Sequence, residues 1–368
     1  MDVTAIVLAG GFATRLRPLT LTKPKPLLPV LDRPLLDWIL EGLEKAGIKR
    51  VILSVRYMAD KIKERYGSGF NSLELEFVEE DRPLGDAGPI RLVDTLIGLT
   101  DTFLVVNGDI FTNIDFAEVI RYHKRVGAVA TIVLTEVDDP SRYGVAVIDE
   151  DTRITRFVEK PPRDQAPSNL VNAGIYVFER EVLKYIPETR ERLKIAKHVL
   201  PKLVEEGKAY GYLFKGLWRD IGVPRDYLLA NIEALEYYYP RGYVSHDAEV
   251  SEEAEIQQPV YIAPYTRIAP GARIGPYTII CSRVVVESKA LVERSIIMQK
   301  SRIEESSVIR SSIIGEGCFI DRWARVEEGS VIGDEVIIAE RVYIAPRTVI
   351  LPFKEVESSI YREGSIVL

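Results

Sequence analysis

Short apolar runs alternate with amphipathic segments along the first 235 residues. The runs have the length and aliphatic character of buried strands, and they occupy residues 5–9, 50–55, 103–109 and 130–137. Between them, residues 35–48 and 116–128 repeat apolar side chains at helical spacing, and Gly47 stands at a typical C-cap position. Strands separated by helices predict a Rossmann-like α/β domain: a mixed, mainly parallel sheet with helices on both faces. Ligands bind such sheets outside the carboxyl ends of the strands.

From residue 256 onward an aliphatic residue recurs every six positions. The series is Ile256, Ile262, Ile268, Ile274, Ile280, Val286, Val292, Ile297, Ile303, Ile309, Ile314, Ile320, Val326, Ile332, Ile338, Ile344 and Ile350. A six-residue period fits neither a helix nor an alternating strand. It predicts a left-handed parallel β-helix, in which each hexapeptide supplies a short strand and a turn and the aliphatic side chain points inward. We expect irregular turns at the two five-residue steps, after Val292 and Ile309.

The two patterns imply two domains, as the length of 368 residues also suggests. Residues 1–235 would form the α/β domain and residues 256–368 the β-helix. Residues 236–255, which are rich in charge and contain a Pro-Arg-Gly sequence, would be the linker. We expect the first domain to fold without the second, because their cores are separate.

Composition narrows the functional classes. The 48 Lys and Arg against 55 Asp and Glu give a net charge of −7, which argues against nucleic acids and anionic membranes as partners. No apolar run approaches a membrane span, and no basic segment precedes the first one, so we expect a cytoplasmic protein. Cys281 and Cys318 are too few for a disulfide framework or a zinc site. The scarcity of Asn and Gln resembles the usage of hyperthermophiles, with lineage bias as the alternative.

The most informative motif follows the first predicted strand. Gly10 and Gly11 would let backbone amides approach a bulky anion, and basic residues follow as far as Lys25. A Gly-Gly turn after a strand is commonplace by itself and usually structural. Here the prolines of the Lys-Pro-Lys-Pro sequence would hold the basic side chains on a stiff loop, which favours phosphate binding.

At this point the sequence resembles a known family. The segment LAGGFATRLRPLTLTKPKPLLPVLDRPLLDWIL is similar to the signature of the sugar nucleotidyltransferases. Further family motifs follow in the family's order: PLGDAG (83–88), NGD (107–109), YG (143–144), FVEKP (157–161), NAGIYVF (172–178) and LWRDIG (217–222). The hexapeptide repeats and the ending ILPFKEVESSI look most like the branch that makes GDP-mannose.

The resemblance implies a Mg²⁺-dependent enzyme that joins a nucleoside triphosphate to a sugar 1-phosphate and expels pyrophosphate. Since the attacking phosphate oxygen is already anionic, the reaction needs alignment and charge neutralisation rather than a general base. GTP and mannose 1-phosphate are the favoured substrates. Glucose 1-phosphate with dTTP or UTP is the alternative pair.

The resemblance also implies roles for individual residues. Nucleotide binding would fall to Leu8, Gly10, Gly11, Thr14, Glu80 and Gly85. The catalytic residues would be Arg15 and Lys25, which hold the triphosphate, and Asp109. Asp109 and Asp220 would hold Mg²⁺. Sugar-phosphate binding would fall to Gly144, Glu159, Lys160 and Asn172. We interpret Arg17 and Lys23 as flanking surface charges.

Base choice would depend on Glu80, five residues before Gly85, where the thymidylyl branch carries Gln. Guanine offers adjacent N1–H and N2–H₂ donors, which one carboxylate can accept together. The alternative is that residues 79–81 form a solvated acidic turn. One departure from the family is Asp86, where Thr or Ser is usual, and it should either point outward or help to hold a metal.

Two other functions remain open at this stage. Acyltransferases also use a left-handed β-helix, with a histidine as general base, but His123, His198 and His246 all precede the repeats. A regulatory paralogue could bind nucleotide-sugars without making them. We interpret the β-helix as a structural element that forms homo-oligomers, or as an allosteric site.

Overall fold

A computed structural model describes residues 3–188 and 191–368. Contacts between residues divide the chain into two compact units. The first comprises the described residues of Met1–Phe12 and Leu36–Asp220, and the second comprises Ala13–Leu35 and Ile221–Leu368. A short N-terminal segment of the predicted α/β domain thus belongs to the unit that contains the repeats.

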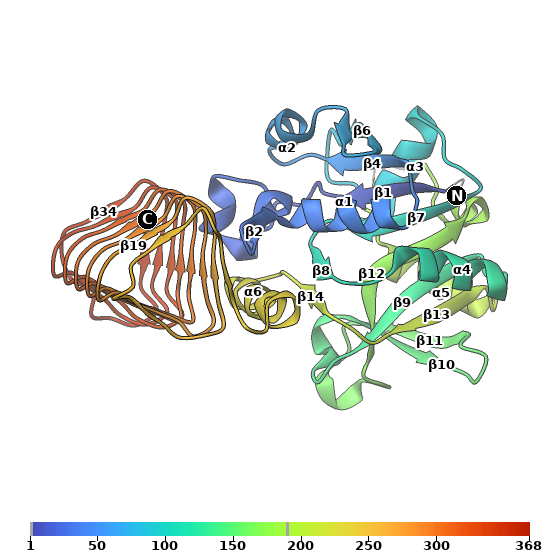
Figure 1. Cartoon of the computed structure of the whole chain (residues 1–368). Coiled ribbons are helices and arrows are strands. Elements are labelled where there is room, and N and C mark those ends of the chain that lie inside the picture. The colour runs from blue at the N-terminus through green and yellow to red at the C-terminus, as the bar shows by residue number, and fades with distance from the viewer. Residues whose placement is uncertain (1–2, 189–190) are drawn as a thin grey trace. The chain divides into compact units, whose positions relative to one another are not determined.

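The first unit is built on a ten-stranded mixed sheet, seen in Figure 1. The strand order is β11-β10-β12-β7-β1-β4-β6-β5, and β9 pairs with both β12 and β13. The strands are β1 (Thr4–Leu8), β4 (Arg50–Val55), β5 (Gly69–Phe70), β6 (Leu73–Glu79), β7 (Thr102–Asn107), β9 (Ala130–Glu136), β10 (Gly144–Ile148), β11 (Ile154–Glu159), β12 (Leu170–Glu179) and β13 (Ala209–Phe214). A separate ribbon pairs β8 (Ile110–Thr112) with β14 (Trp218–Asp220).

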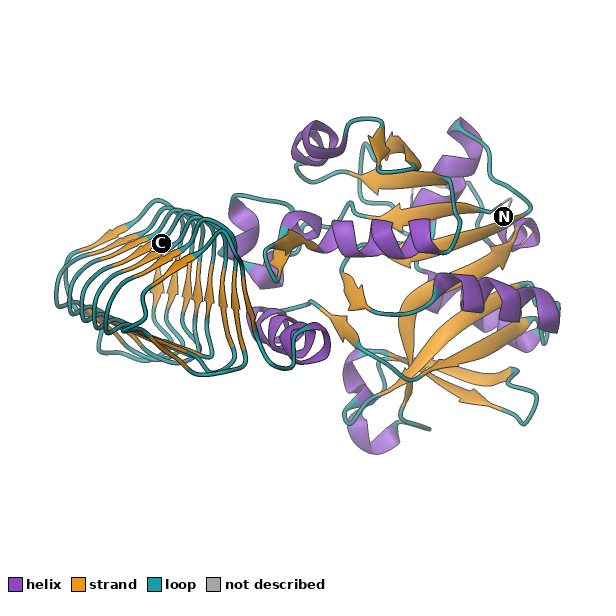
Figure 2. Ribbon diagram, viewed as in Figure 1, coloured by secondary structure: helices purple, strands orange, loops and turns teal. Residues whose placement is uncertain are grey.

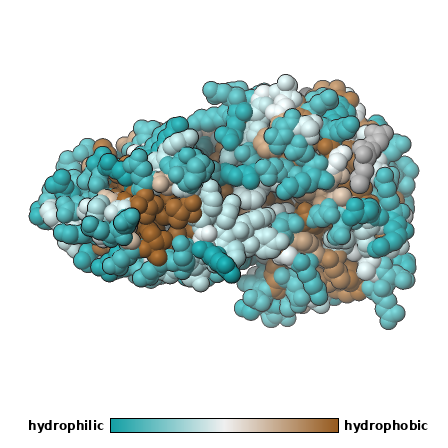
Figure 3. All heavy atoms as spheres, in the orientation of Figure 1, coloured by the Kyte–Doolittle hydropathy of each residue, from teal (hydrophilic) through white to brown (hydrophobic). Residues whose placement is uncertain are grey.

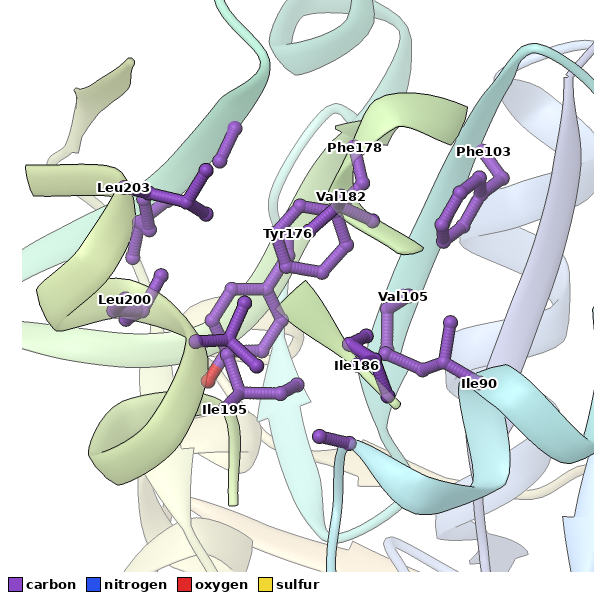
Figure 4. Packing of buried hydrophobic residues seen from close by; sticks show 14 of the residues in the cluster. Ile90, Phe103, Val105, Tyr176, Phe178, Val182, Ile186, Ile195, Leu200 and Leu203 are labelled. Carbon is purple, nitrogen blue, oxygen red and sulfur yellow. The ribbon is translucent and has the colours of Figure 1, made fainter. Parts of the chain in front are cut away.

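Helices cover both faces of this sheet (Figure 2). They are α1 (Leu35–Lys45), α2 (Ala59–Tyr66), α3 (Gly88–Leu96), α4 (Phe116–Val126) and α5 (Leu200–Glu205), with 3-10 turns at Arg163–Gln165 and Arg180–Tyr185 and a π-helical turn at Ile195–Val199. On one face, α3, α5 and the turns at Arg180–Tyr185 and Ile195–Val199 bury an apolar cluster that includes Ile90, Phe103, Tyr176 and Leu203 (Figure 4). The predicted α/β architecture is therefore confirmed.

The elements predicted from the sequence occur with small differences at their ends. The strand β4 has the predicted bounds, and β1, β7 and β9 begin or end within two residues of them. Helices α1 and α4 also begin at the predicted residues. Gly47 has a φ of 78°, the left-handed conformation that the predicted C-cap requires.

The second unit contains a prism of three parallel sheets. The first sheet stacks β15 (Tyr243–Val244), β18 (Val260–Ile262), β21 (Thr278–Ile280), β24 (Ile296–Ile297), β27 (Ile313–Ile314), β30 (Val331–Ile332), β33 (Val349–Ile350) and β35 (Ile366–Val367). The second stacks β16 (Glu249–Val250), β19 (Arg267–Ile268), β22 (Val285–Val286), β25 (Arg302–Ile303), β28 (Phe319–Ile320), β31 (Ile337–Ile338) and β34 (Glu355–Val356). The third stacks β17 (Glu255–Ile256), β20 (Arg273–Ile274), β23 (Leu291–Glu293), β26 (Val308–Arg310), β29 (Arg325–Val326) and β32 (Tyr343–Ile344).

These sheets confirm the parallel β-helix predicted from the six-residue period. Sixteen of the seventeen aliphatic residues in the series are fully buried in the prism core, and Ile256 is partly buried. In each five-residue step a left-handed residue directly follows the strand: Arg294, with φ 46°, follows β23, and Ser311, with φ 42°, follows β26.

The predicted linker differs from the structure. Residues 236–255 contain the end of helix α6 (Pro224–Tyr238), the strands β15 and β16 and the first residue of β17, and these strands pair with β18, β19 and β20. This segment forms the first coil of the prism. The regular aliphatic series starts only at Ile256, so the sequence pattern did not reveal the coil.

The remainder of the second unit is the Ala13–Leu35 segment and helix α6. The segment contains 3-10 turns at Thr14–Leu16, Leu19–Leu21 and Lys25–Leu27, and a small ribbon of β2 (Pro29–Val30) and β3 (Arg33–Pro34). Helix α6 contacts both β2 and the prism strand β21. Cys281 and Cys318 are free and buried. In the residues that the structure describes, no helix is long and apolar enough to cross a membrane.

Candidate active site

The Gly-Gly motif follows the central strand of the sheet at its carboxyl end. Leu8, the last residue of β1, pairs with Ser54 of β4 on one side and Asn107 of β7 on the other. The amide of Gly108 donates to the Leu8 carbonyl over 2.9 Å, and a Cβ at Gly108 would lie 2.8 Å from that oxygen. The Gly-Gly and NGD motifs are therefore adjacent, at the edge where ligands of α/β sheets bind.

Glu80 lies behind the Gly-Gly turn. One of its carboxylate oxygens accepts a 3.0 Å hydrogen bond from the Ser54 hydroxyl, and the other accepts from the Leu84 amide over 3.2 Å. A Cβ at Gly10 would lie 2.7 Å from Oε1 of Glu80, so glycine is needed there to make room for the carboxylate. Both residues were predicted to contact the nucleotide, and the structure brings them together.

The three acidic residues at 79–81 have different environments. Glu79 is exposed and forms an ion pair with Lys63, and Asp81 is exposed beside Arg82. Glu80 is buried, with 8% of its surface accessible. Burial raises the pKa of the Glu80 carboxyl, against the lowering effects of the Leu84 amide, the Ser54 hydroxyl and the Arg56 charge. A solvated acidic turn therefore does not describe Glu80, although its two neighbours are exposed, Glu79 at the end of β6 and Asp81 after it.

Sequence reasoning missed an aromatic and cationic group beside this turn. The guanidinium of Arg56 lies 4.7 Å from the centre of the Phe12 ring, and that ring packs against Tyr57 with centres 5.2 Å apart. Phe12 is 44% exposed although it is a large apolar residue. In the sequence, only the position of Phe12 directly after Gly11 could have indicated that it lies at the site.

Strand pairing explains how two distant aspartates approach each other. Asp109 follows β7 and directly precedes β8, and Asp220 is the last residue of β14. In the antiparallel ribbon, Asp220 pairs with Ile110, the residue after Asp109. Opposite residues in such a ribbon have Cα atoms about 4.5–5.5 Å apart, so both carboxylates belong to one end of the ribbon.

This arrangement fits a metal that the substrate helps to bind. In residues 3–188 and 191–368, no cluster of three or more His, Cys, Asp or Glu side chains is present that could hold a metal ion. Mg²⁺ typically takes one or two protein carboxylates and completes its shell with water and substrate phosphates. Asp109 and Asp220 would supply such a pair.

The predicted sugar-phosphate residues gather around the β10–β11 hairpin. Gly144 pairs with Glu159, and a Cβ at Gly144 would lie 2.4 Å from the Phe157 ring and 3.0 Å from a carboxylate oxygen of Glu159. The next residue, Lys160, is exposed and donates its amide to the Tyr143 carbonyl over 2.9 Å. Its φ of 50° is unusual for a residue with a side chain, and such strained backbone clusters at functional sites.

Asn172 forms the start of a bulge in β12. Its side chain accepts from the Gly174 amide over 2.9 Å and donates to the Tyr176 hydroxyl over 2.7 Å. The register of β12 against β9 shifts between Asn172 and Tyr176, and the Trp218 indole donates to the Ala173 carbonyl in the bulge over 3.0 Å. Asn172 thus shapes the strand beside the β14 ribbon, because Trp218 belongs to β14.

Gly85 and Asp86 contact Leu193 and Ile195, which are distant in the sequence but belong to the same unit. A Cβ at Gly85, where φ is 88°, would lie 1.9 Å from the Leu193 carbonyl oxygen. The amides of Asp86 and Ala87 both donate to this oxygen, and the Asp86 carboxylate accepts from the Ile195 amide over 2.5 Å. We expected Asp86 to point outward or to hold a metal, and this was wrong: its carboxylate caps the backbone at Ile195.

Tyr176 is a second residue that sequence reasoning missed, although it lies within the quoted NAGIYVF motif. It is 3% exposed and lies beside Ile195 in the core (Figure 4). Burial raises the pKa of its hydroxyl, and the negative charges of Asp86, Glu159 and Asp109 raise it further. Tyr176 therefore stays a neutral hydrogen-bonding group among the candidate site carboxylates.

The remaining predicted residues belong to the second unit. Thr14 and Arg15 lie in the first 3-10 turn and are exposed, whereas Lys25 begins the third and is 7% exposed. Arg17 is exposed, as expected. Lys23 is not a surface charge: its side chain is 16% exposed and forms ion pairs with Glu316 and Asp334. The sequence could not show this, because both partners lie about 300 residues further along the chain.

Two known protein families match this chain, one after the other along the sequence. The profile described as Nucleotidyl transferase matches residues 4–236, and the profile described as GMPPB C-terminal domain matches residues 242–366. This chain belongs to the nucleotidyl transferase family. The boundary between the two matches lies at the end of helix α6, before β15.

Several individual proteins are similar to this family member. A Sulfolobus acidocaldarius protein, provisionally named mannose-1-phosphate guanyltransferase, is 47% identical over 67% of each chain. The mannose-1-phosphate guanylyltransferase of Mycobacterium tuberculosis is 40% identical over 62% of this chain and 63% of its own. The chain thus aligns with about two thirds of the length of these relatives. Crystal structures of HddC from Yersinia pseudotuberculosis, one of them complexed with GMP-PN, are 30% identical, with a TM-score of 0.53 over 62% of this chain and 98% of theirs.

Proposed function

We propose that this family member transfers the guanylyl group of GTP to mannose 1-phosphate, forming GDP-mannose and releasing pyrophosphate. One observation carries the proposal: the nucleotidyl transferase and GMPPB C-terminal profiles match in succession from residue 4 to residue 366. Relatives named for mannose-1-phosphate guanylyl transfer, at 40–47% identity, support the same substrates.

The reaction needs no general base. A phosphate oxygen of the sugar 1-phosphate attacks the α-phosphorus of the triphosphate, and the bond from that phosphorus to the bridging oxygen breaks with its electron pair. Pyrophosphate leaves with those electrons, so no proton has to be moved before bond formation. The protein must align the two anions and stabilise the charge on five-coordinate phosphorus.

We assign the triphosphate to the residues that follow β1. Leu8, Gly10 and Gly11 would bring backbone close to the nucleotide at the carboxyl end of the strand. Thr14, Arg15 and Lys25 would hold the phosphates and stabilise the leaving pyrophosphate, with Arg15 and Lys25 supplying positive charge. Gly85 would keep its loop close to the nucleotide, while its missing side chain leaves room for the backbone at Leu193.

Mg²⁺ would be held by Asp109 and Asp220 together with substrate phosphates. Bound in this way, it would neutralise phosphate charge as the α-phosphorus is attacked. On the sugar side, Lys160 would bind the 1-phosphate and Glu159 would accept hydrogen bonds from sugar hydroxyls. Gly144 and Asn172 would line the same pocket, and the bulge that begins at Asn172 supports this position.

Guanine would be read by Glu80. A carboxylate has about four lone-pair sites, and in Glu80 the two observed hydrogen bonds, from Ser54 and Leu84, leave acceptor capacity for N1–H and N2–H₂ of guanine. Thymine and uracil would instead direct carbonyl oxygens toward the carboxylate. The burial of Glu80 supports this role over that of its exposed neighbours.

The proposed partners are the two substrates and, through the prism, further copies of the chain. We infer a cytoplasmic location, where nucleoside triphosphates are supplied. The face of the molecule in Figure 3 is mainly hydrophilic, and a hydrophobic patch lies over the prism. That copies of the chain associate through the prism is a prediction, which light scattering can test.

A pyrophosphate-release assay with GTP, Mg²⁺ and mannose 1-phosphate tests the proposed function. We expect release that depends on both substrates and on Mg²⁺, and a product with the mass of GDP-mannose. Binding of GDP-mannose without any turnover would instead identify a regulatory paralogue. Preferred turnover of glucose 1-phosphate with dTTP or UTP would identify the alternative substrate pair.

A further inference from the structure

Four polar residues of the prism occupy one corner of four successive coils. They are Ser282, Gln299, Glu316 and Asp334, which we call the corner row. Each stands two residues after a strand of the first sheet, namely β21, β24, β27 and β30. Because these strands are stacked in register, the four side chains lie above one another along the prism.

The Ala13–Leu35 segment is attached to this row at two points. The Asp32 carboxylate accepts from the Ser282 amide over 3.1 Å and from the Gln299 amide group over 3.0 Å. The Lys23 ammonium lies 2.9 Å from a carboxylate oxygen of Glu316 and 3.4 Å from one of Asp334. Thr22 also donates its hydroxyl to Asp334 over 2.6 Å.

The Lys23 attachment is a largely buried charge cluster. The Lys23 and Asp334 side chains are 16% and 8% exposed. Burial alone would lower the pKa of Lys23, but the charges of Asp334 and Glu316 outweigh it and keep the pKa raised. Removing one partner of a buried pair leaves an uncompensated charge, so this contact is far more sensitive to substitution than a surface ion pair.

Helix α6 holds the same segment from another side. The Tyr227 hydroxyl donates to the Pro29 carbonyl over 2.5 Å, and the Asn231 side chain accepts from the Leu31 amide over 2.9 Å. Tyr227 and Asn231 are fully buried. The stretch from Thr22 to Asp32, with Lys25 inside it, is thus fixed between the corner row and α6.

We propose that the corner row positions the triphosphate-binding segment, so that the prism takes part in catalysis without touching the substrate. This inference rests on the proposed function, in which Arg15 and Lys25 bind the triphosphate. If a substrate-positioning group is misplaced by about 1 Å, the reaction can slow roughly 10²-fold. A fixed attachment of residues 22–32 would prevent such a misplacement of Lys25. Lys23, Asp32 and the corner row are positioning residues in this account.

The inference is tested in the full-length chain with Lys23→Met, which removes the ammonium and keeps an unbranched apolar stem of the same length. We expect KM for GTP to rise about tenfold, while KM for mannose 1-phosphate changes less than about twofold, since the anchored segment serves the triphosphate. Lys23→Arg should restore most of the affinity for GTP because it keeps the charge. Glu293→Gln is the control, since it removes the charge from a 2.8 Å ion pair with Arg310 on the surface of the prism, away from residues 13–35.

Hydrogen exchange without substrate gives an independent measurement. Peptides from residues 13–35 should exchange faster in Lys23→Met than in wild type, and prism peptides should not. An unchanged KM for GTP, or equal changes in the KM values of both substrates, would overturn the inference. If wild type releases no pyrophosphate, the proposed function fails, and unchanged exchange of residues 13–35 would then separately overturn the anchoring.

Discussion

A side-chain carbon at Gly10 would lie 2.7 Å from Oε1 of Glu80, closer than non-bonded atoms normally approach. The glycine and the carboxylate are thus complementary, although 70 residues separate them in the sequence. Glu80 is held in place by Ser54 and Leu84, so it cannot swing aside without losing hydrogen bonds. The turn proposed to bind nucleotide and the residue proposed to read its base form one packed group.

Gly10→Ala tests this packing. The added methyl group would displace the Glu80 carboxylate, and overpacking of this kind costs about 1–3 kcal/mol in the free energy of unfolding. Gly11→Ala is the matched control, because nothing lies within 4 Å of a Cβ there. Thermal or denaturant unfolding should show a clear loss for Gly10→Ala only. Equal stability of the two variants would contradict the packing.

The contact of Gly85 with Leu193 gives a second pair of variants. In Gly85→Ala the methyl group would meet a backbone oxygen at 1.9 Å, which no side-chain rotation relieves, so we expect a loss above about 3 kcal/mol. Gly98 has a similar φ of 83° but nothing within 4 Å, so Gly98→Ala should cost only the conformational strain, about 1–2 kcal/mol. Urea unfolding of both variants measures the difference, and equal losses would show that the Leu193 contact can relax.

Asp109→Asn and Asp220→Asn should each lower kcat by about 100-fold or more without loss of fold, because the metal loses a formal counter-charge. Asp151→Asn, a change in an exposed turn, is the control for the loss of one negative charge. Steady-state kinetics at saturating Mg²⁺ and circular dichroism measure both effects. A near-normal kcat in either variant would remove that aspartate from the metal site.

Asp86 should make stability depend on pH. Burial raises the pKa of its carboxyl in the folded state, against the lowering effects of the Ile195 amide and the Lys194 charge. The folded protein therefore binds this proton more tightly than the unfolded chain, and the contribution of Asp86 to stability falls as pH rises through the folded pKa. Asp86→Asn keeps an acceptor for Ile195, so wild type should gain stability relative to it as the pH is lowered from neutral toward the ordinary pKa of an aspartate carboxyl. Parallel Tm profiles for the two proteins would contradict this.

The sequence predicted the prism well because every coil must place an aliphatic side chain in the core at the same position. An inward position accepts only an aliphatic side chain, so the period of six is visible without any structure. The corners were less predictable. Most left-handed residues there, such as Tyr265, Arg283 and Lys300, are not glycines, so a search for glycine turns misses them.

The contacts of the site could be predicted only in part. Motifs located the strand ends, and strand pairing then brought Asp109 and Asp220 to one ribbon. The environments of Lys23 and Asp86 could not be predicted, since their partners lie about 300 and 109 residues away and carry no recognisable pattern. A charge in a sequence does not show whether it will meet water or a buried opposite charge.

Base selectivity tests the central claim, guanylyl transfer, most directly. The measurement is kcat/KM for GTP, dTTP, UTP and ATP with mannose 1-phosphate, in wild type, Glu80→Gln and Glu79→Gln. Glu79 is the matched control, because it is the exposed neighbour that pairs with Lys63. We expect wild type and Glu79→Gln to prefer GTP strongly. The preference should reach factors on the order of 10⁴ over bases that would leave the buried Glu80 carboxylate without a hydrogen-bond donor. Glu80→Gln should lose most of that preference, and a wild type that prefers a pyrimidine triphosphate, or a Glu80→Gln with unchanged ranking, would contradict the account.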